Sequence, residues 1–290
     1  MNTTKRARLF LILSMTAFGT LAPFVRRIAV SSGELALYRA ILASLLIGGF
    51  LLVTRQKMDF RSLKKELLLL LFSGVAMGFN WILLFEAYKY TTVAIATLSY
   101  YFAPVIVTLV CPLLFHEKLS KKQVLCFVMS TLGLSLVTGI TNLGSGGNDA
   151  VGIAFGLGAA VLYATVILLN KFIKGVTGIH RTFLQFLAAV AVLTPYVLFT
   201  SGMNLGNLDV AGWGCLLIVG LVHTGITYCL YFTSLKELSG QEAAILSYID
   251  PLVAVVIGVL VLKEPLSWQQ LCGGALILGF TLLNELDLGK

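Results

Sequence analysis

Asp250 is the residue of this chain whose type differs most from its surroundings. It lies between Ile249 and Pro251, inside an apolar run that extends over about residues 241–262. An unpaired charge is costly in hydrocarbon, so an acid in such a run is a candidate proton carrier or a ligand for a cationic group. The alternative is structural. Aspartate is a favoured helix N-cap and proline a favoured first helical residue, so Asp250 also suits the cap of a half-helix that restarts at Pro251.

Aromatic and polar residues inside other apolar runs are the next candidates. Aromatic walls with a few polar groups suit a cationic or amphipathic organic solute, through stacking and cation–π contact. The alternative is a packed core in which each hydroxyl bonds a neighbouring carbonyl or, for a histidine, a neutral ring bonded to the backbone. Together with Asp250, the residues that we expect to contact a solute are Tyr100, Tyr101, Tyr248, Trp81, Asn80 and His223.

Arg39 lies within another apolar run, at about residues 34–53. Its guanidinium fork suits an anionic group such as the carboxylate of a solute. The alternative is an ion pair with a structural or gating role, with Glu34 or Glu86 as the partner. Glu86 has the same two interpretations, because Lys89 lies one helical turn away.

The motifs of ATP-driven and hydrolytic proteins do not occur in this sequence. It has no Walker motif, no HExxH and no GxSxG, and only three histidines. The five cysteines are scattered through apolar runs without a CxxC spacing, so we expect them to pack as small residues. We therefore expect no enzyme activity, no cofactor and no metal site.

One pattern occurs twice in the same register, 147 residues apart. Residues 101–123 and 248–270 share seven identities in 23 ungapped positions. The first copy contributes Tyr101, Pro104, Leu113, Glu117, Leu119, Ser120 and Gln123, and the second contributes Tyr248, Pro251, Leu260, Glu264, Leu266, Ser267 and Gln270. Each copy is an apolar run with an internal proline, closed by a short charged turn, and a duplicated membrane unit is typical of transporters.

The composition predicts an all-α membrane protein. The chain is 58% hydrophobic and 12% charged, and its mean hydropathy is +0.94. Backbone groups in lipid must be satisfied locally, so each apolar run is expected to be a transmembrane helix. We place ten of them at about residues 9–25, 34–53, 67–88, 92–115, 123–140, 151–173, 180–200, 210–234, 241–262 and 267–285.

The polar, glycine-rich segment 141–150 separates two sets of five helices. Five is odd, so the second set enters the membrane from the opposite side and the two repeats are inverted. We expect a first five-helix repeat at residues 1–140, a linker at 141–150 and a second repeat at 151–290. Glycine pairs such as Gly152 and Gly156 are expected to serve close helix packing.

The distribution of positive charge orients the chain. With the N-terminus inside, sixteen of the 21 Lys and Arg residues fall in inside segments and four fall outside. This positive-inside bias predicts a multi-pass protein of the cell (inner) membrane with both termini cytoplasmic. The net charge of +8 is thus an orientation signal and gives no reason to expect a nucleic-acid partner. The expected partners are the lipid bilayer and a small organic solute.

These residues resemble the EamA family of the drug/metabolite transporter superfamily. The resemblance rests on the motif "P … E-x-L-(S/T)-x-x-Q", which Pro104, Glu117 and Gln123 match in one copy and Pro251, Glu264 and Gln270 in the other. It covers essentially all 290 residues. The resemblance implies a ten-helix secondary transporter with alternating access, and it implies no particular substrate. The tryptophan often found near the end of the family's first helix is replaced here by Phe18-Gly19.

The function that we expect is secondary transport of an amino acid or related amine-bearing metabolite, in the export direction and coupled to protons through Asp250. A polytopic membrane enzyme acting on lipid is one alternative, and it would need acid, histidine and donor groups near one membrane face. A passive channel is the other, and it would need a continuous polar stripe through the pore. The mid-span positions here are mainly aromatic or aliphatic.

Overall fold

The computed structural model describes residues 3–55, 60–115, 121–138, 149–176, 178–235, 237–238, 243 and 246–286. Within these residues the regular secondary structure is entirely helical. The elements are α1 (Thr3–Gly19), α2 (Leu21–Arg27), α3 (Ser32–Val53), α4 (Phe60–Tyr90), α5 (Val93–Tyr100), α6 (Ala103–Phe115), α7 (Lys121–Thr138), α8 (Asp149–Phe172), α9 (Gly178–Thr200), η2 (Leu205–Asn207), α10 (Val210–Leu217), the π-helix η3 (Ile218–Ile226), α11 (Thr227–Ser234), α13 (Ile249–Leu260) and α14 (Trp268–Leu286).

The ten expected spans are confirmed. In chain order they correspond to α1–α2, α3, α4, α5–α6, α7, α8, α9, α10–η3–α11, α13 and α14. In the described part of the chain, seven helical stretches are long and apolar enough to cross a membrane, and two shorter apolar helices follow them. Several residues named above lie outside the described ranges, among them Glu117 and the linker residues 141–148.

Three of the spans are interrupted, and each interruption lies just before a proline. Thr20 separates α1 from α2, Tyr101–Phe102 separates α5 from α6, and Tyr248 is a turn before α13. Proline has no N–H, and its ring clashes with the carbonyl four residues earlier, so a helix breaks within that preceding turn. Pro23, Pro104 and Pro251 occupy this position relative to the three breaks.

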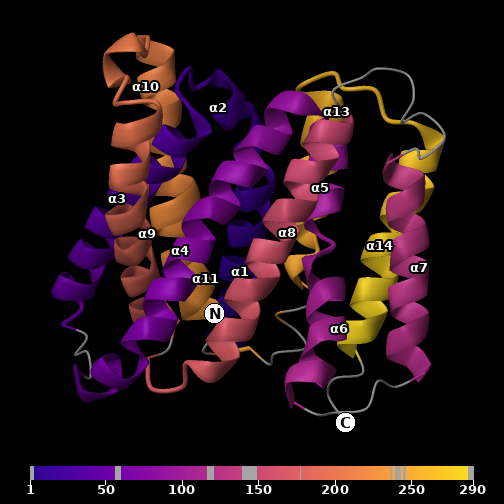
Figure 1. Cartoon of the computed structure of the whole chain (residues 1–290), viewed down its shortest axis with the longest axis horizontal. Coiled ribbons are helices and arrows are strands. Elements are labelled where there is room, and N and C mark those ends of the chain that lie inside the picture. The colour runs from indigo at the N-terminus through magenta and orange to yellow at the C-terminus, as the bar shows by residue number, and fades with distance from the viewer. Residues whose placement is uncertain are drawn as a thin grey trace.

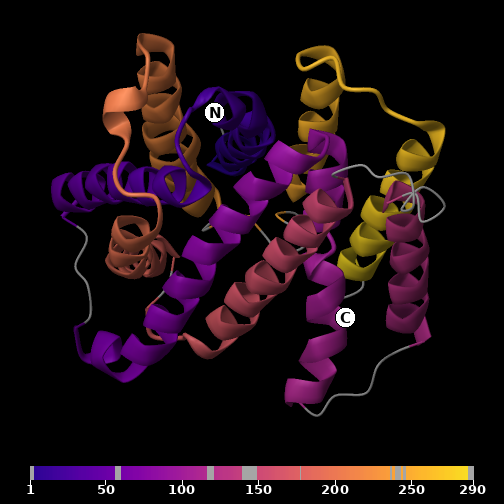
Figure 2. The ribbon, with the colours of Figure 1, turned by 45° about the horizontal axis from the view of Figure 1, so that its top comes forward.

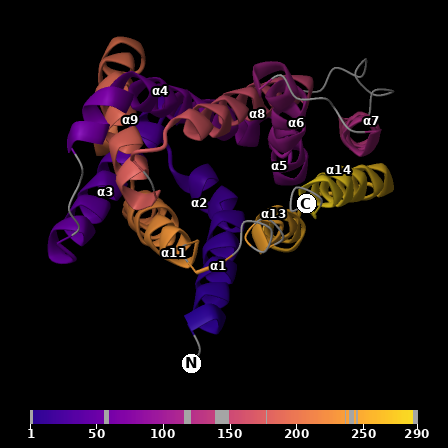
Figure 3. The same cartoon turned by 90° about the horizontal axis from the view of Figure 1, so that it is seen from below.

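The two repeats cross the bundle in opposite directions (Figure 1). At the right of this view, α7 runs upward from the lower edge, whereas α14 descends from the loop above α13. Seen from below, α7 and α14 form a separate pair at one side of the molecule (Figure 3). They approach closely because both carry glycine at the contact, where a Cβ on Gly273 would lie too close to the carbonyl oxygen of Gly133. The expectation that span glycines serve packing is met here and at Gly152 and Gly156, which face Thr91 and Ser99.

The halves interleave in space. α4 lies diagonally along α8 (Figure 2) and also packs on α9, while α1 packs on α11 and α13. Polar contacts join the same elements. Glu66 of α4 accepts the backbone N–H groups of Lys174, Gly175 and Val176, at 2.8, 2.8 and 3.0 Å, in the turn between α8 and α9. Helices of each half therefore pack on helices of the other half and form hydrogen bonds with them.

Candidate functional site

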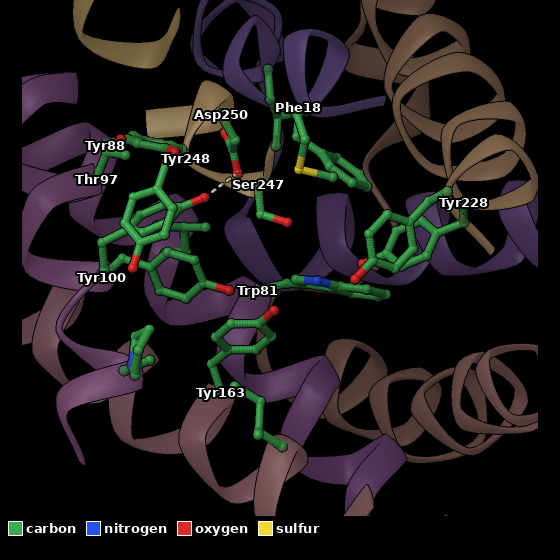
Figure 4. A pocket seen from close by; sticks show the side chains of 18 of the residues that line it. Phe18, Trp81, Tyr88, Thr97, Tyr100, Tyr163, Tyr228, Ser247, Tyr248 and Asp250 are labelled. Atoms are coloured by element: carbon green, nitrogen blue, oxygen red, sulfur yellow. Dashed lines mark hydrogen bonds between the residues drawn. The ribbon is translucent and has the colours of Figure 1, made fainter. Parts of the chain in front are cut away.

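A cavity of about 290 Å³ lies between the two halves. Its lining comes from α1 to α6 in the first half and from α8, α11 and the start of α13 in the second. Figure 4 shows Trp81, Tyr163 and Tyr228 converging on this space from three different helices. The volume is at the lower end of the range of ligand pockets, roughly 300–1,000 Å³, which suits a small organic solute.

Tyrosine dominates the wall of this cavity. Of the ten tyrosines in the chain, seven line it: Tyr88, Tyr100, Tyr101, Tyr163, Tyr228, Tyr231 and Tyr248. The rings support one another, since Tyr100 stacks on Tyr163 with centroids 5.3 Å apart and Phe18 meets Tyr228 edge-on at 5.2 Å. Such a wall offers ring faces to a cation and hydroxyl groups to polar atoms.

Asp250 is the acid of the cavity. It lies in the first turn of α13, and its Oδ2 accepts a 2.6 Å hydrogen bond from the hydroxyl of Tyr101, drawn as the dashed line in Figure 4. Tyr101 sits at the break between α5 and α6, so the bond joins the broken spans of the two repeats. Gly19 approaches Asp250 from a third side. Its missing Cβ lets the end of α1 rest on the backbone carbonyl of Asp250.

The alternative interpretation of Asp250 as a helix cap does not fit the local geometry. The N-cap position of α13 is Tyr248, and no side chain caps it. Asp250 comes two residues later and its bond goes to Tyr101, so its carboxylate is not used on the N–H groups at the start of α13. The turn before α13 thus places the carboxylate of Asp250 in the cavity without using it as a helix cap.

Arg39 also lines the cavity, and the ion pair considered for it with Glu34 or Glu86 is not formed. Glu34 instead caps its own helix at Ser31 and accepts the N–H of Asn204 at 2.5 Å. Glu86 pairs with Lys89 at 3.0 Å, in a partly exposed position. The expectation failed because both carboxylates have nearer backbone or lysine partners, which position along the chain does not reveal.

Arg39 is held by the other half of the molecule. Its Nε donates to Thr224 Oγ1 at 2.8 Å, and its guanidinium lies over the ring of Trp81 at 4.6 Å. Thr224 belongs to η3, whose Gly220 and Gly225 admit Leu42 and Leu46 of α3. π-helical segments often occur at functional sites, and here the segment brings Thr224 to the arginine.

Asn80 and His223 lie outside the lining, contrary to expectation. Asn80 donates to the carbonyl of Ala159 at 2.6 Å and so ties α4 to α8. His223 contacts Thr20 Oγ1 at 3.1 Å and the ring of Phe24, beside the α1–α2 break. Both are polar residues in apolar spans whose bonding needs are met by neighbouring helices, a role that depth in a span does not distinguish from solute binding. The other expected residues, Asp250, Tyr100, Tyr101, Tyr248 and Trp81, are brought together around the cavity.

Tyr88, Tyr163, Tyr228 and Tyr231 complete the wall and were not among the expected residues. Tyr163 carried a usable signal, since a tyrosine in the centre of an apolar span needs a partner for its hydroxyl. Tyr88 and Tyr231 fall near the ends of their spans, where tyrosine usually marks the membrane interface.

The end of the bundle at which α2 lies is closed by a polar cluster. Glu264, in the loop after α13, pairs with Arg26 at 2.5 Å and accepts the N–H of Val93, the first residue of α5, at 2.8 Å. Arg26 also donates to the carbonyls of Tyr88 and Thr91, at 2.9 and 2.8 Å. The ends of α2, α4 and α5 are thereby tied to the second repeat.

A second polar link lies at the same end, outside the spans. Asp209 caps α10 by accepting the N–H of Gly212 at 2.7 Å, and it pairs with Arg27 at 2.5 Å. The bond from Gly212, supported by Arg27, lowers the pKa of this carboxyl below its usual range. The link is therefore present at neutral pH and weakens only in acid.

The arrangement can bind a cation and exchange a proton at one carboxylate. Metal chemistry has no donor set in the described residues, where no group of three or more His, Cys, Asp or Glu side chains is suitably placed. The acid, the hydroxyl of Tyr101 and the ring faces are what a solute would meet.

Comparison with known proteins agrees with this arrangement. The chain matches the EamA-like transporter family over residues 5–139 and 150–285. It is 32% identical over 254 residues to the uncharacterized transporter YxxF of Bacillus subtilis (strain 168), covering 85% of this chain and 79% of the relative. An uncharacterized transporter of Archaeoglobus fulgidus is 29% identical over 278 residues, covering 94% of each chain.

The fold recurs in a solved crystal structure of low sequence similarity. The two chains superpose with a TM-score of 0.66 at 18% identity, and the match covers 97% of each. This likeness shows that the two chains share a fold.

Proposed function

The chain belongs to the EamA-like transporter family, and from this premise we propose that it exports a small organic solute that carries an ammonium group. It is a multi-pass membrane protein and a transporter. The proposed solute is an amino acid or a related amine-bearing metabolite, and the proposed mechanism is alternating access of the cavity between the two inverted repeats.

The observation that carries this proposal is the pairing of one acid with an aromatic wall. Asp250 is held by Tyr101 in a cavity where seven tyrosines and Trp81 present rings. An ammonium group gains both a charge partner and ring faces there, whereas an anion would face the carboxylate. A cavity of about 290 Å³ limits the solute to a small molecule.

Proton coupling follows from competition at the same carboxylate. Ionised Asp250 holds the ammonium group of the solute, and release of the solute outside frees the carboxylate to take up one proton from the exterior. The protonated, neutral form then returns to the cytoplasmic side and releases that proton. One proton enters for each cationic group that leaves, and an inward proton gradient drives export.

The proposed orientation places the α2 end outside the cell. Sixteen of the 21 Lys and Arg residues fall in the segments expected on the opposite side, and this positive-inside bias supports a cytoplasmic position for both termini of the proposed inner-membrane protein. The cluster of Arg26, Glu264 and Val93 is then an external closure. Outward opening requires these contacts to part.

Counterflow in proteoliposomes tests the proposal. Proteoliposomes that contain the purified protein are loaded with unlabelled solute, and the uptake of labelled amino acids, polyamines and quaternary amines is measured. The same assay is run with the variant Asp250→Asn. We expect saturable exchange of an ammonium compound by the native protein, and loss of pH-driven accumulation in Asp250→Asn. Exchange that survives in the variant makes Asp250 the proton carrier, and loss of exchange in a folded variant makes it a solute ligand. Unchanged accumulation and exchange in the variant would refute the role of Asp250.

A further inference from the structure

Arg39 is a buried cation without an acidic partner among the residues that the structure describes. Its side chain belongs to a residue only 3% exposed, in the middle of the bundle. In the residues that the structure describes, the hydrogen bond from its Nε to Thr224 is the one bond recorded for its guanidinium. An uncompensated charge at this depth is costly, and intramembrane arginines generally face partners or pathways.

The surroundings of Arg39 orient the guanidinium without neutralising it. The ring of Trp81 lies 4.6 Å from its central carbon and that of Phe85 lies 5.5 Å away. Thr224, which accepts from Nε, itself donates to the carbonyl of Val219 at 2.7 Å and is therefore fixed in orientation. One edge of the fork is thus anchored, and the terminal nitrogens remain for a ligand. Because Arg39 is part of the cavity lining, that ligand is a solute in the cavity.

Arg39 and Asp250 line the same cavity without forming an ion pair. The described ion pairs are Arg26–Glu264, Arg27–Asp209 and Lys89–Glu86. The cavity therefore presents one guanidinium and one carboxyl group that are not paired with each other. A solute with one charge of each sign can satisfy both, and a solute with a single charge leaves the other group unpaired.

We propose that Arg39 is a carboxylate subsite and that the cavity selects dipolar solutes over amines that lack the acid group. The ammonium group lies at Asp250 and the carboxylate on the guanidinium fork, with the tyrosine rings between. This inference rests on the proposed function, since it adds a second pole to the ammonium site. Thr224 is a positioning residue in it, because it holds the fork through Nε.

Matched triplets of compounds separate the two poles. One triplet is L-phenylalanine, phenethylamine and 3-phenylpropionate, and the other is L-leucine, isoamylamine and 4-methylpentanoate. Within each triplet the side chain is constant, while the amino acid has both charges, the amine one and the acid the other. Counterflow of all six is measured in proteoliposomes with the native protein, with Arg39→Gln, and with the pair Thr224→Val and Thr224→Ser.

The native protein is expected to exchange at least one amino acid in preference to its matched amine. Arg39→Gln should lower that amino-acid-to-amine ratio by about tenfold or more, the effect of losing a charge-assisted bidentate contact. Thr224→Val should lower the ratio by a smaller factor, and Thr224→Ser, which keeps the hydroxyl, should restore it. A purely structural role of Thr224 would change the amount of folded protein and leave the ratio unaltered.

Two groups of results overturn the inference, and they distinguish failure of the carboxylate subsite alone from failure of the proposed function. If amines exchange as well as amino acids, or if the ratio is the same in Arg39→Gln, the carboxylate subsite is wrong and the ammonium site stands. If only the carboxylic acids exchange, or none of the six compounds does, the proposed function fails and the subsite with it. Should Arg39→Gln fail to fold, the two Thr224 variants decide the matter by the same ratio.

Discussion

The fourth spans of the two repeats are interrupted at corresponding positions, but only the span of the second repeat carries an acid there. In the first half, α5 ends at Tyr100, the turn contains Tyr101, and α6 begins at Ala103. In the second half, the turn is Tyr248 and α13 carries Asp250 in its first turn. Positions 103 and 250 correspond in the repeat, as do the tyrosines and the prolines that follow.

The surroundings of the two corresponding positions explain why only one carries an acid. Ala103 also borders the cavity, but it is 0% exposed and packs with Ala160 and Ala164 of α8, so little space remains around its methyl group. Asp250 is partly exposed to the cavity and receives the hydroxyl of Tyr101 from the opposite repeat. The framework thus occurs twice, and the charged group lies at the copy where the other repeat provides a hydrogen-bond donor.

Moving the acid from the second repeat to the first is expected to have the largest effect on stability and exchange. In the double variant Ala103→Asp with Asp250→Ala, the new carboxylate lies among alanine methyl groups. We expect a loss of about 3 kcal/mol in the free energy of unfolding, the typical cost of an acid in the middle of a span, together with loss of exchange. Melting in detergent and counterflow measure the two effects, with Asp250→Ala alone as the control. A double variant that has the same melting temperature as this control and recovers exchange would show that the two positions are interchangeable.

Gly19 tests whether the second break depends on its contact with α1. A Cβ at this position would lie 2.6 Å from the carbonyl oxygen of Asp250 and 2.6 Å from Val253 Cβ, so α13 must shift. We expect Gly19→Ala to destabilise the protein by about 2 kcal/mol, as overpacking commonly does, and to reduce accumulation. Gly49→Ala is the matched control, because a Cβ there meets nothing within 4 Å. Equal melting temperatures for the two variants would contradict the contact.

Tyr101 and Tyr100 separate the hydrogen bond from the aromatic wall. Both line the cavity, but the hydroxyl of Tyr101 is the one that bonds Asp250, at 2.6 Å. Tyr101→Phe should reduce exchange by about tenfold, since hydrogen bonds to charged groups contribute about 1.5–3 kcal/mol. Tyr100→Phe keeps the ring and leaves that bond intact, so its effect should be much smaller. Initial rates of counterflow at several external pH values provide the measurement, and equal losses in both variants would count against the bond.

The ten spans and their inverted arrangement were predictable because they depend on local properties. Apolar length, the position of prolines and the 147-residue repeat are all visible along the chain. The membership of the cavity was predictable for the acid Asp250 and for the aromatic residues Tyr100, Tyr101, Tyr248 and Trp81, which lie inside apolar spans. Asn80 and His223 also lie inside apolar spans and nevertheless bond neighbouring helices.

The partners of charged groups were the least predictable feature. Placement toward the same external side of the membrane favoured Glu34 or Glu86 as the partner of Arg39, whereas the structure gives it a threonine 185 residues away. Glu264 lies in the short charged turn of the second copy, and its carboxylate accepts the N–H at the start of α5, a helix of the other repeat. Such pairs depend on how the two halves interleave, and one sequence without its fold does not contain that geometry.

Glu66 receives its three N–H donors from a turn that begins 108 residues later in the chain. During synthesis the first five spans enter the bilayer before that turn exists, so this carboxylate must wait in water or headgroups until the second half arrives. In an ancestor with a single repeat, the same bonds would require a second molecule inserted in the opposite orientation. A chain that carries both repeats makes that encounter, which would depend on the abundance of both orientations, unnecessary, because the partner is tethered at a high local concentration.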